Sequence, residues 1–120
     1  MRFLLRLLFP PKCVLCGRVL PDSQTDLCPK CRQTTVDFPK ANRKISFVAG
    51  WTALWYYSGS VRDSLLRYKF SHRRSYAEVY GRLLAMKLQN NPLCQYDVLT
   101  WVPISKQRLR KRGYDQVELI

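Results

Sequence analysis

The chain has 120 residues, and 21 lysines and arginines against eight acidic residues give it a formal charge of +13. Its hydrophobic content of 47% excludes a disordered basic tail, which would lack the apolar residues needed to offset chain entropy. The charge favours an anionic partner, which narrows the candidates to nucleic acid, nucleotide phosphates or an anionic membrane surface.

The N-terminal stretch MRFLLRLLFPPK lacks the pattern of a signal peptide. Arg6 interrupts its apolar run, and Pro10 and Pro11 close the run without a small-residue cleavage site. No stretch of the chain approaches the ~20 apolar residues of a transmembrane helix. Residues 2–9 are predicted to form a short helix that packs on the protein or touches a membrane or partner. The expected location is the cytoplasm, including the inner face of the membrane.

Two CxxC pairs follow, separated by eleven residues. Without a secretory signal, their cysteines are expected to be reduced thiols rather than disulfides. Each CxxC turn can direct two sulfurs at one ion, and two such turns complete the tetrahedral S4 shell that Zn(II) prefers. The sequence therefore predicts a zinc ribbon whose ligands are Cys13, Cys16, Cys28 and Cys31.

The residues between the pairs favour this ribbon over its alternatives. Gly17 suits a tight turn after the first pair, and Pro21, Asp22 and Ser23 mark a turn at the tip. The alternatives are two redox dithiols, unrelated buried cysteines or an iron–sulfur centre. A thioredoxin-type CxxC belongs in a βαβ context that residues 1–40 lack. Cys94 stands apart from both pairs and is expected to be structural or incidental.

A basic link over residues 37–44 separates the ribbon, residues 1–40, from a second unit, residues 45–120. Residues 45–59 are rich in β-branched and aromatic side chains, which predicts one bent strand or two paired strands. Ser60 with Asp63 resembles a capping box that opens a helix.

A second capping box at Ser75 and Glu78 predicts a longer helix that ends at Asn90-Asn91-Pro92. Residues 96–105 contain a short apolar run that predicts a buried parallel strand. A basic loop over residues 106–112 then leads through Gly113 to the first turns of another helix. This order of elements is typical of the start of an α/β domain.

Several motifs occur along the chain in a fixed order: FPPKCVLCG at residues 9–17, CPKC at 28–31, YKF at 68–70, and VPIS followed by RLRKRGYDQ at 102–116. Together they resemble the ComF family. The resemblance implies a competence-associated protein that acts in DNA uptake, with a zinc ribbon and a type I phosphoribosyltransferase-like α/β domain. A helicase or another protein of the competence machinery is the implied protein partner.

Only the first half of that family's pattern is matched. Its members continue to adjacent acidic residues and a Thr-Thr-Gly loop that holds phosphoribosyl pyrophosphate (PRPP), whereas no two acidic residues are adjacent here. The chain is therefore expected to be truncated before the PRPP loop, with an incomplete α/β domain. PRPP and Mg(II) are implied only for a full-length relative, and no catalytic residue is assigned.

Two basic segments are predicted to contact phosphate, and single-stranded DNA is the expected ligand. The segment after the predicted strand is the carboxyl end at which α/β sheets bind ligands, and RYKFSHRR at residues 67–74 interleaves cations with aromatic rings. A solvated charge run and a buried role for Tyr68 are the simpler alternatives. The candidate contacts are Arg67, Lys69, Arg73, Arg74, Lys106, Arg108, Arg110, Lys111, Arg112, Gly113 and Gln116.

Three functions are thus compared. The first is a zinc-binding, single-stranded-DNA-binding protein of natural transformation. The second is a phosphoribosyltransferase, which needs the missing PRPP loop. The third is a zinc-ribbon adaptor that binds a protein partner through the ribbon and the N-terminal helix.

Overall fold

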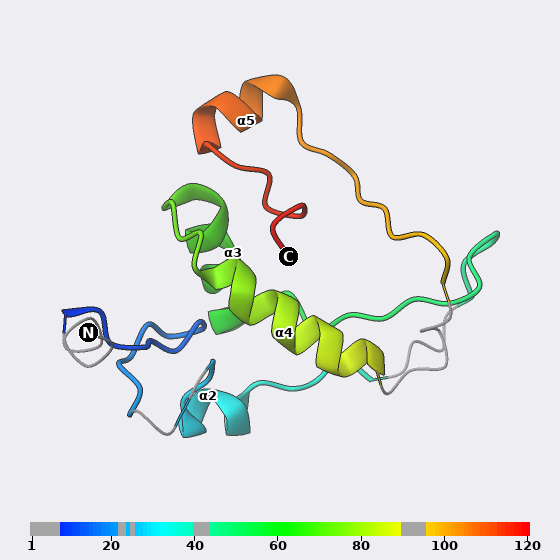
Figure 1. The fold of residues 1–120 in the computed structure, drawn as a ribbon. Coiled ribbons are helices and arrows are strands. Elements are labelled where there is room, and N and C mark those ends of the chain that lie inside the picture. Colours follow the sequence, from blue (N-terminus) through cyan, green and yellow to red (C-terminus); the bar gives the residue numbers. More distant parts are fainter. Residues whose placement is uncertain (1–7, 22–23, 25, 40–43, 90–95) are drawn as a thin grey trace.

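A computed structural model describes residues 8–21, 24, 26–39, 44–89 and 96–120. Its helices in chain order are α2 (Pro29–Thr34), α3 (Gly59–Phe70), α4 (Tyr76–Gln89) and α5 (Lys106–Arg112). Helices α3 and α4 form the centre, with α2 on one side and α5 on the other (Figure 1). Most of the predicted helix over residues 2–9, the predicted turn at Asp22 and Ser23, the predicted helix end at Asn90-Asn91-Pro92, and Cys94 lie outside the described residues.

One buried cluster joins the N-terminal segment to the helices. Val14, Leu15, Leu20 and Leu27 lie before α2, and they belong to the same cluster as side chains of α3, α4 and the segment after α5. The helical members are Val61, Tyr68, Ala77 and Tyr80, and Tyr114 follows α5. The ribbon is therefore packed on the helices rather than tethered to them as a separate unit.

The two central helices agree with the sequence pattern, with one shift at an end. Helix α3 begins at Gly59 with Ser58 as its N-cap, so the predicted cap at Ser60 is two residues late, and Ser58 makes no side-chain cap bond. Helix α4 begins at Tyr76, next to the predicted cap Ser75. Gly81 of α4 allows a close approach, because a Cβ there would lie 2.7 Å from the carbonyl oxygen of Ile120.

The predicted strand or strand pair over residues 45–59 is wrong. Among the described residues of this segment there are only isolated bridges, one between Ile45 and Val48 and one between Asp37 and Trp55. Phe47 has a φ of 64°, which turns the chain sharply between the partners of the first bridge. A left-handed residue interrupts the extended backbone that a strand needs, so the β-rich composition yields a turn and an open loop.

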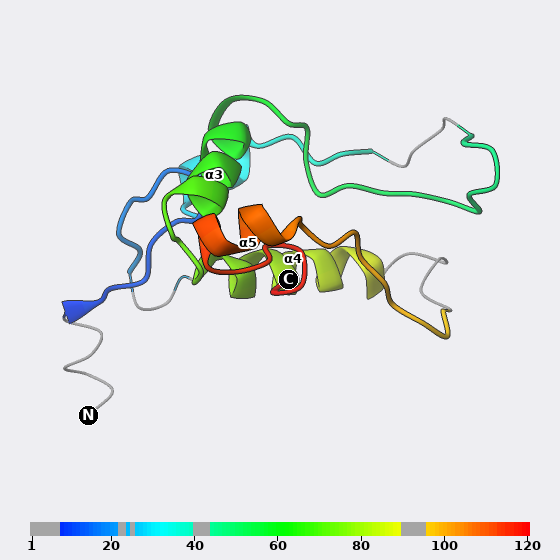
Figure 2. The ribbon, with the colours of Figure 1, turned by 90° about the horizontal axis from the view of Figure 1, so that it is seen from above.

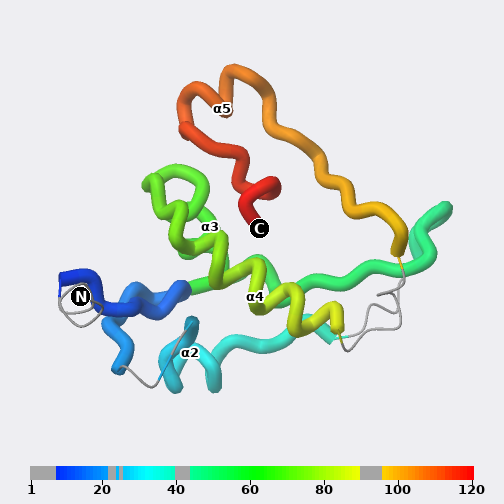
Figure 3. Tube along the Cα trace, viewed as in Figure 1, coloured from blue at the N-terminus to red at the C-terminus, as the bar shows by residue number. Residues whose placement is uncertain are grey.

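The predicted parallel strand over residues 96–105 is also wrong. Residues 96–105 lead into α5 as an open connection (Figure 3), and Val98, Leu99 and Val102 are exposed. A strand exists only beside a second backbone that supplies hydrogen-bond partners, and no described segment does so here. Outside the ribbon, the regular elements of the described residues are consequently the helices α3, α4 and α5, joined by open connections, and these residues do not form the sheet of the expected α/β domain.

The order of loop and helix after residue 105 is reversed from the prediction. Residues 106–112, predicted as a basic loop, form α5, while residues 114–120, predicted as a helix, form turns. Ser105 caps α5 by accepting a hydrogen bond from the Arg108 N–H at 3.4 Å. Gly113 ends it with a φ of 79°, a left-handed conformation that favours glycine. Among the described helices, none is long and apolar enough to cross a bilayer.

Candidate metal centre and basic hollow

Four cysteine sulfurs meet at one point of the N-terminal segment. The Sγ atoms of Cys13, Cys16, Cys28 and Cys31 all lie within 4.8 Å of one another. The Sγ atoms of Cys16 and Cys28 are 3.7 Å apart. With Zn–S bonds of about 2.3 Å, a tetrahedral site places its sulfurs about 3.8 Å apart, so the donor set fits Zn(II) in number, kind and spacing.

The first pair lies on a tight hairpin. Lys12 and Val19 form an antiparallel bridge, and the Gly17 N–H donates to the Cys13 carbonyl oxygen at 2.8 Å. Gly17 has a φ of 76°, as the sequence predicted for the turn after this pair. The hairpin turns Cys13 inward, where it is fully buried, and leaves Cys16 exposed.

The second pair begins helix α2. Cys28 is its N-cap, and its sulfur accepts a hydrogen bond from the Cys31 N–H at 3.4 Å. Pro29 suits the first helical position, because no intrahelical partner is needed there. One helical turn therefore brings Cys28 and Cys31 to the same face, with both side chains buried.

The electrostatics of this cysteine cluster favour a bound cation. The Cys31 N–H lowers the pKa of Cys28 to about 7, so its thiolate is accessible near neutral pH. Burial and the neighbouring sulfurs raise the pKa of Cys31 above the range of an ordinary thiol. A divalent ion reduces this conflict, because its positive charge stabilises the thiolates that bind it.

The ribbon is held to the helices by polar contacts that the sequence analysis did not identify. Ser64 of α3 donates to the carbonyl oxygen of Val14, and Arg67 donates to that of Leu15. Arg82 of α4 donates two hydrogen bonds, of 2.6 and 3.2 Å, to the Asp26 carboxylate. The sequence did contain a signal for the role of Ser64, because this serine lies among the apolar positions of the predicted amphipathic helix.

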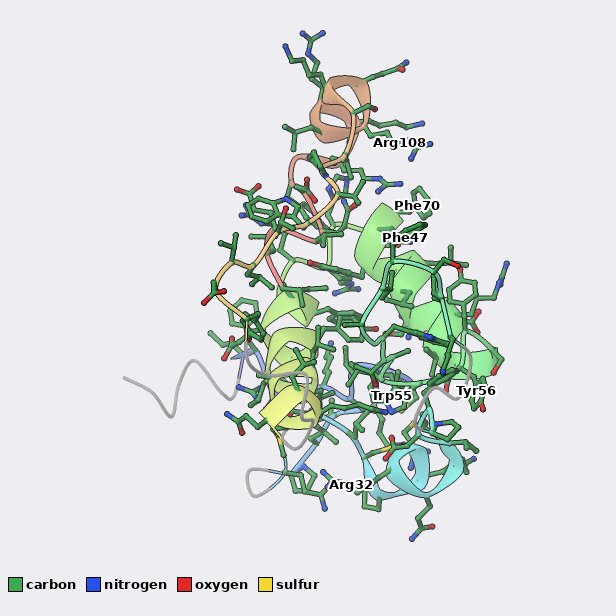
Figure 4. The ribbon with its side chains drawn as sticks, turned by 90° about the vertical axis from the view of Figure 1, so that its right-hand side faces the viewer. Arg32, Phe47, Trp55, Tyr56, Phe70 and Arg108 are labelled. Carbon is green, nitrogen blue, oxygen red and sulfur yellow. The ribbon has the colours of Figure 1, made fainter. Side chains whose placement is uncertain are left out.

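A basic hollow lies at the other end of α3. It has a volume of about 410 Å³ and is lined by Lys69, Phe70, His72, Arg108, Lys111 and Arg112. The first three come from the end of α3 and the turn after it, and the other three come from α5. The Arg112 guanidinium lies 4.8 Å from the centre of the Phe70 ring. Figure 4 shows Phe70 and Arg108 at one end of the molecule and Arg32 of α2 at the other.

Only some of the predicted phosphate-contacting residues line the basic hollow. Lys69, Arg108, Lys111 and Arg112 line it together, and His72, to which the sequence assigned no role, joins them. Lys106 and Arg110 lie on α5 but do not line the hollow. Gly113 serves as the helix cap.

Gln116 and three arginines of the predicted set have other contacts. Gln116 is buried and accepts a hydrogen bond from Arg112 at 2.5 Å. Arg67 is bonded to the ribbon, Arg74 lies over the ring of Tyr114, and Arg73 lines a groove beside the N-terminal segment. These arginines act within the protein or away from the hollow.

A comparison with known families addresses the metal centre. Residues 4–43 match the double zinc ribbon domain. The N-terminal segment is a double zinc ribbon. Its four cysteines are positioned for metal binding, which confirms the zinc-ribbon prediction for this part of the chain. Neither the curated proteins nor the solved structures contain a match to the chain.

Proposed function

We propose that this zinc-ribbon protein binds single-stranded nucleic acid, with the phosphate backbone in the basic hollow between α3 and α5. The observation that carries the proposal is the hollow itself. Two basic segments that are separated by more than thirty residues in the sequence converge on it, and none of its six lining residues is acidic. Metal binding by the ribbon supplies the folding free energy that holds this arrangement.

The chemistry of the lining suits a single strand. Four basic side chains neutralise phosphates and release their counterions, while Phe70 is 62% exposed and offers an aromatic surface beside them. Exposed bases stack on such rings whatever their sequence. The finer form of the proposal is a ComF-like role in DNA uptake, which rests on the motifs at residues 9–17, 28–31 and 102–116.

The two alternative functions, the phosphoribosyltransferase and the protein-binding adaptor, have fewer observations in their favour. For the phosphoribosyltransferase, Thr34-Thr35 is followed by Val36 rather than glycine, and adjacent acidic residues are missing. An adaptor role has one observation behind it: the exposed apolar side chains of residues 98–102, which a protein partner could cover. Binding of such a partner would leave the basic hollow free, so the adaptor function and nucleic-acid binding are separable.

The test is the salt dependence of binding to a labelled oligodeoxythymidylate, measured by fluorescence anisotropy on the zinc-loaded chain. Log affinity should fall with log salt by about 0.7 per phosphate contact. Replacing Lys69, Arg108 and Lys111 by glutamine should flatten the slope by about two units. The matched control replaces Arg18, Lys30 and Arg62, which removes the same charge outside the hollow. Equal flattening in both variants would contradict the proposal, since binding would then follow net charge alone.

A further inference from the structure

We propose that the metal centre controls the basic hollow through a relay of buried side chains, in which Tyr80 and Tyr68 are positioning residues. The inference concerns regulation of the hollow and therefore rests on the proposed function. It follows from a continuous series of contacts that begins at the first CxxC turn and ends at Arg112.

The first step joins the metal turn to α3 and α4. Val14 lies between two of the cysteine ligands, and its carbonyl oxygen accepts a hydrogen bond from Ser64, which is fully buried. The Ser64 oxygen is 2.6 Å from the Tyr80 hydroxyl. Because the single Ser64 proton is donated to Val14, Tyr80 must donate to Ser64. The three groups form an ordered chain of donors in which each bond polarises the next.

The second step runs along α3 to the segment after α5. Tyr68 lies one turn beyond Ser64, and its ring centre is 5.7 Å from that of Tyr80. The Tyr68 hydroxyl donates to the carbonyl oxygen of Gln116 at 2.8 Å, and Tyr114 donates back to the carbonyl oxygen of Tyr68. Burial raises the pKa of Tyr68 to about 12 and also raises that of Tyr80, so both remain donors at neutral pH.

The third step reaches the hollow. The Gln116 side chain is fixed by its own bond to the Tyr114 carbonyl oxygen at 3.1 Å, and its Oε1 atom accepts from Arg112. This bond holds the Arg112 guanidinium over Phe70. In Figure 2, seen from above, α5 overlaps α3 and α4, and Figure 1 shows that it lies on the side of these helices away from α2.

The metal sets the starting point of the relay. Zinc bound to Cys13 and Cys16 fixes the backbone of Val14 between them, and with it the acceptor that orders Ser64 and Tyr80. Removal of zinc frees this backbone, so the ordering of the hollow weakens. By linkage, a ligand that binds the ordered hollow raises the affinity for zinc by the same factor by which zinc raises the affinity for that ligand.

The test uses two measurements, and neither requires an enzymatic activity of the protein. Hydrogen exchange of the amides of residues 112–116 is measured without nucleic acid in three zinc-loaded proteins: the wild type, Tyr80→Phe and Tyr76→Phe. Tyr80→Phe keeps the ring and removes the donor, whereas Tyr76 contacts the Tyr80 ring from outside the relay. We expect exchange to be about fivefold faster or more in Tyr80→Phe and unchanged in Tyr76→Phe, with zinc content unchanged in both.

The second readout is the zinc affinity, measured against a chromogenic chelator with and without a short oligodeoxythymidylate. The oligonucleotide should raise zinc affinity about fivefold or more in the wild type and less in Tyr80→Phe. Exchange that is identical in the wild type and Tyr80→Phe, or equally faster in Tyr76→Phe, overturns the relay. If the exchange result holds but the oligonucleotide does not bind, the relay stands and the proposed function fails.

Discussion

At the scale of single residues, four cysteine side chains lie close together in one small volume. Three of the four clustered cysteines are buried and only Cys16 is exposed. Burial disfavours isolated thiolates, while the short distances between sulfurs disfavour several thiolates at once. The cluster is therefore stable as a charged group only around a cation, and protein folding and metal binding are coupled.

Replacing Cys28 and Cys31 together by serine should abolish zinc binding, because it removes half of the ligand set and the sulfur that caps α2. Metal analysis of protein purified without added zinc should give one zinc per wild-type chain and none in the variant, and the variant should lose its cooperative thermal transition. Cys94→Ser is the control and should retain one zinc. A zinc content that survives the double replacement would reject these ligands.

At the scale of elements, α5 depends on its surroundings. Seven residues are too few for a stable isolated helix, and five of these seven are cationic. The segment after it supplies the support. Asp115 accepts hydrogen bonds of 3.0 Å from the N–H groups of Ile104 and Val117, so one carboxylate ties the residues before α5 to the turn after it.

The Asp115 contacts predict a specific acid sensitivity. The N–H of Ile104 is the main cause of the lowered pKa of Asp115. A carboxyl whose pKa is lower in the folded state stabilises the fold above its unfolded value, about 3.9, and that contribution is lost as pH falls through the folded value. Thermal melts should thus show Asp115→Asn to be less stable than the wild type at pH 7, with the difference shrinking below pH ~4. A difference that is constant with pH would contradict this role.

At the scale of the whole molecule, the chain is more open than a typical domain. Its radius of gyration is 16.2 Å, against about 13.6 Å for a compact domain of this length. Two long connections, residues 44–57 and 96–104, project to the same side, away from α3 (Figures 1 and 2). The stability of the whole therefore rests on the contacts between the ribbon and the two central helices.

Arg82 tests this dependence, because its ion pair with Asp26 joins α4 to the ribbon. The pair is bidentate, and the Asp26 side chain is only 11% exposed. Arg82 is itself 43% exposed, so we expect Arg82→Ala to lower the free energy of unfolding by about 1 kcal/mol rather than by the cost of a buried pair.

Urea unfolding of the zinc-loaded protein measures that change, and Arg62→Ala is the matched control. Arg62 pairs with Asp63 at 3.6 Å, and both side chains are more than half exposed. Its replacement should change stability by less than about 0.5 kcal/mol. Equal effects at the two positions would show that the Asp26 pair does not hold the ribbon in place.

The sequence by itself determined the features that depend on local spacing. Two CxxC pairs at this separation predict one S4 site, and the structure brings the four sulfurs together. Gly17 was predicted to turn the chain, and α4 to begin near Ser75, for the same reason: each depends on a few neighbouring residues. The two basic segments were also visible as candidates, because charge density is a local property.

The tertiary structure decided what depends on partners distant in the sequence. Residues 96–105 have the composition of a buried strand, but a strand needs a neighbouring backbone, and the described residues provide none. Residues 106–112 form a helix that Ser105 and Gly113 cap, and Asp115 joins Ile104, just before the helix, to the turn after it. Only three-dimensional packing assigned Arg67 to the ribbon and brought Lys69 and Lys111 to the same hollow, since long-range contacts leave no periodic signal in the sequence.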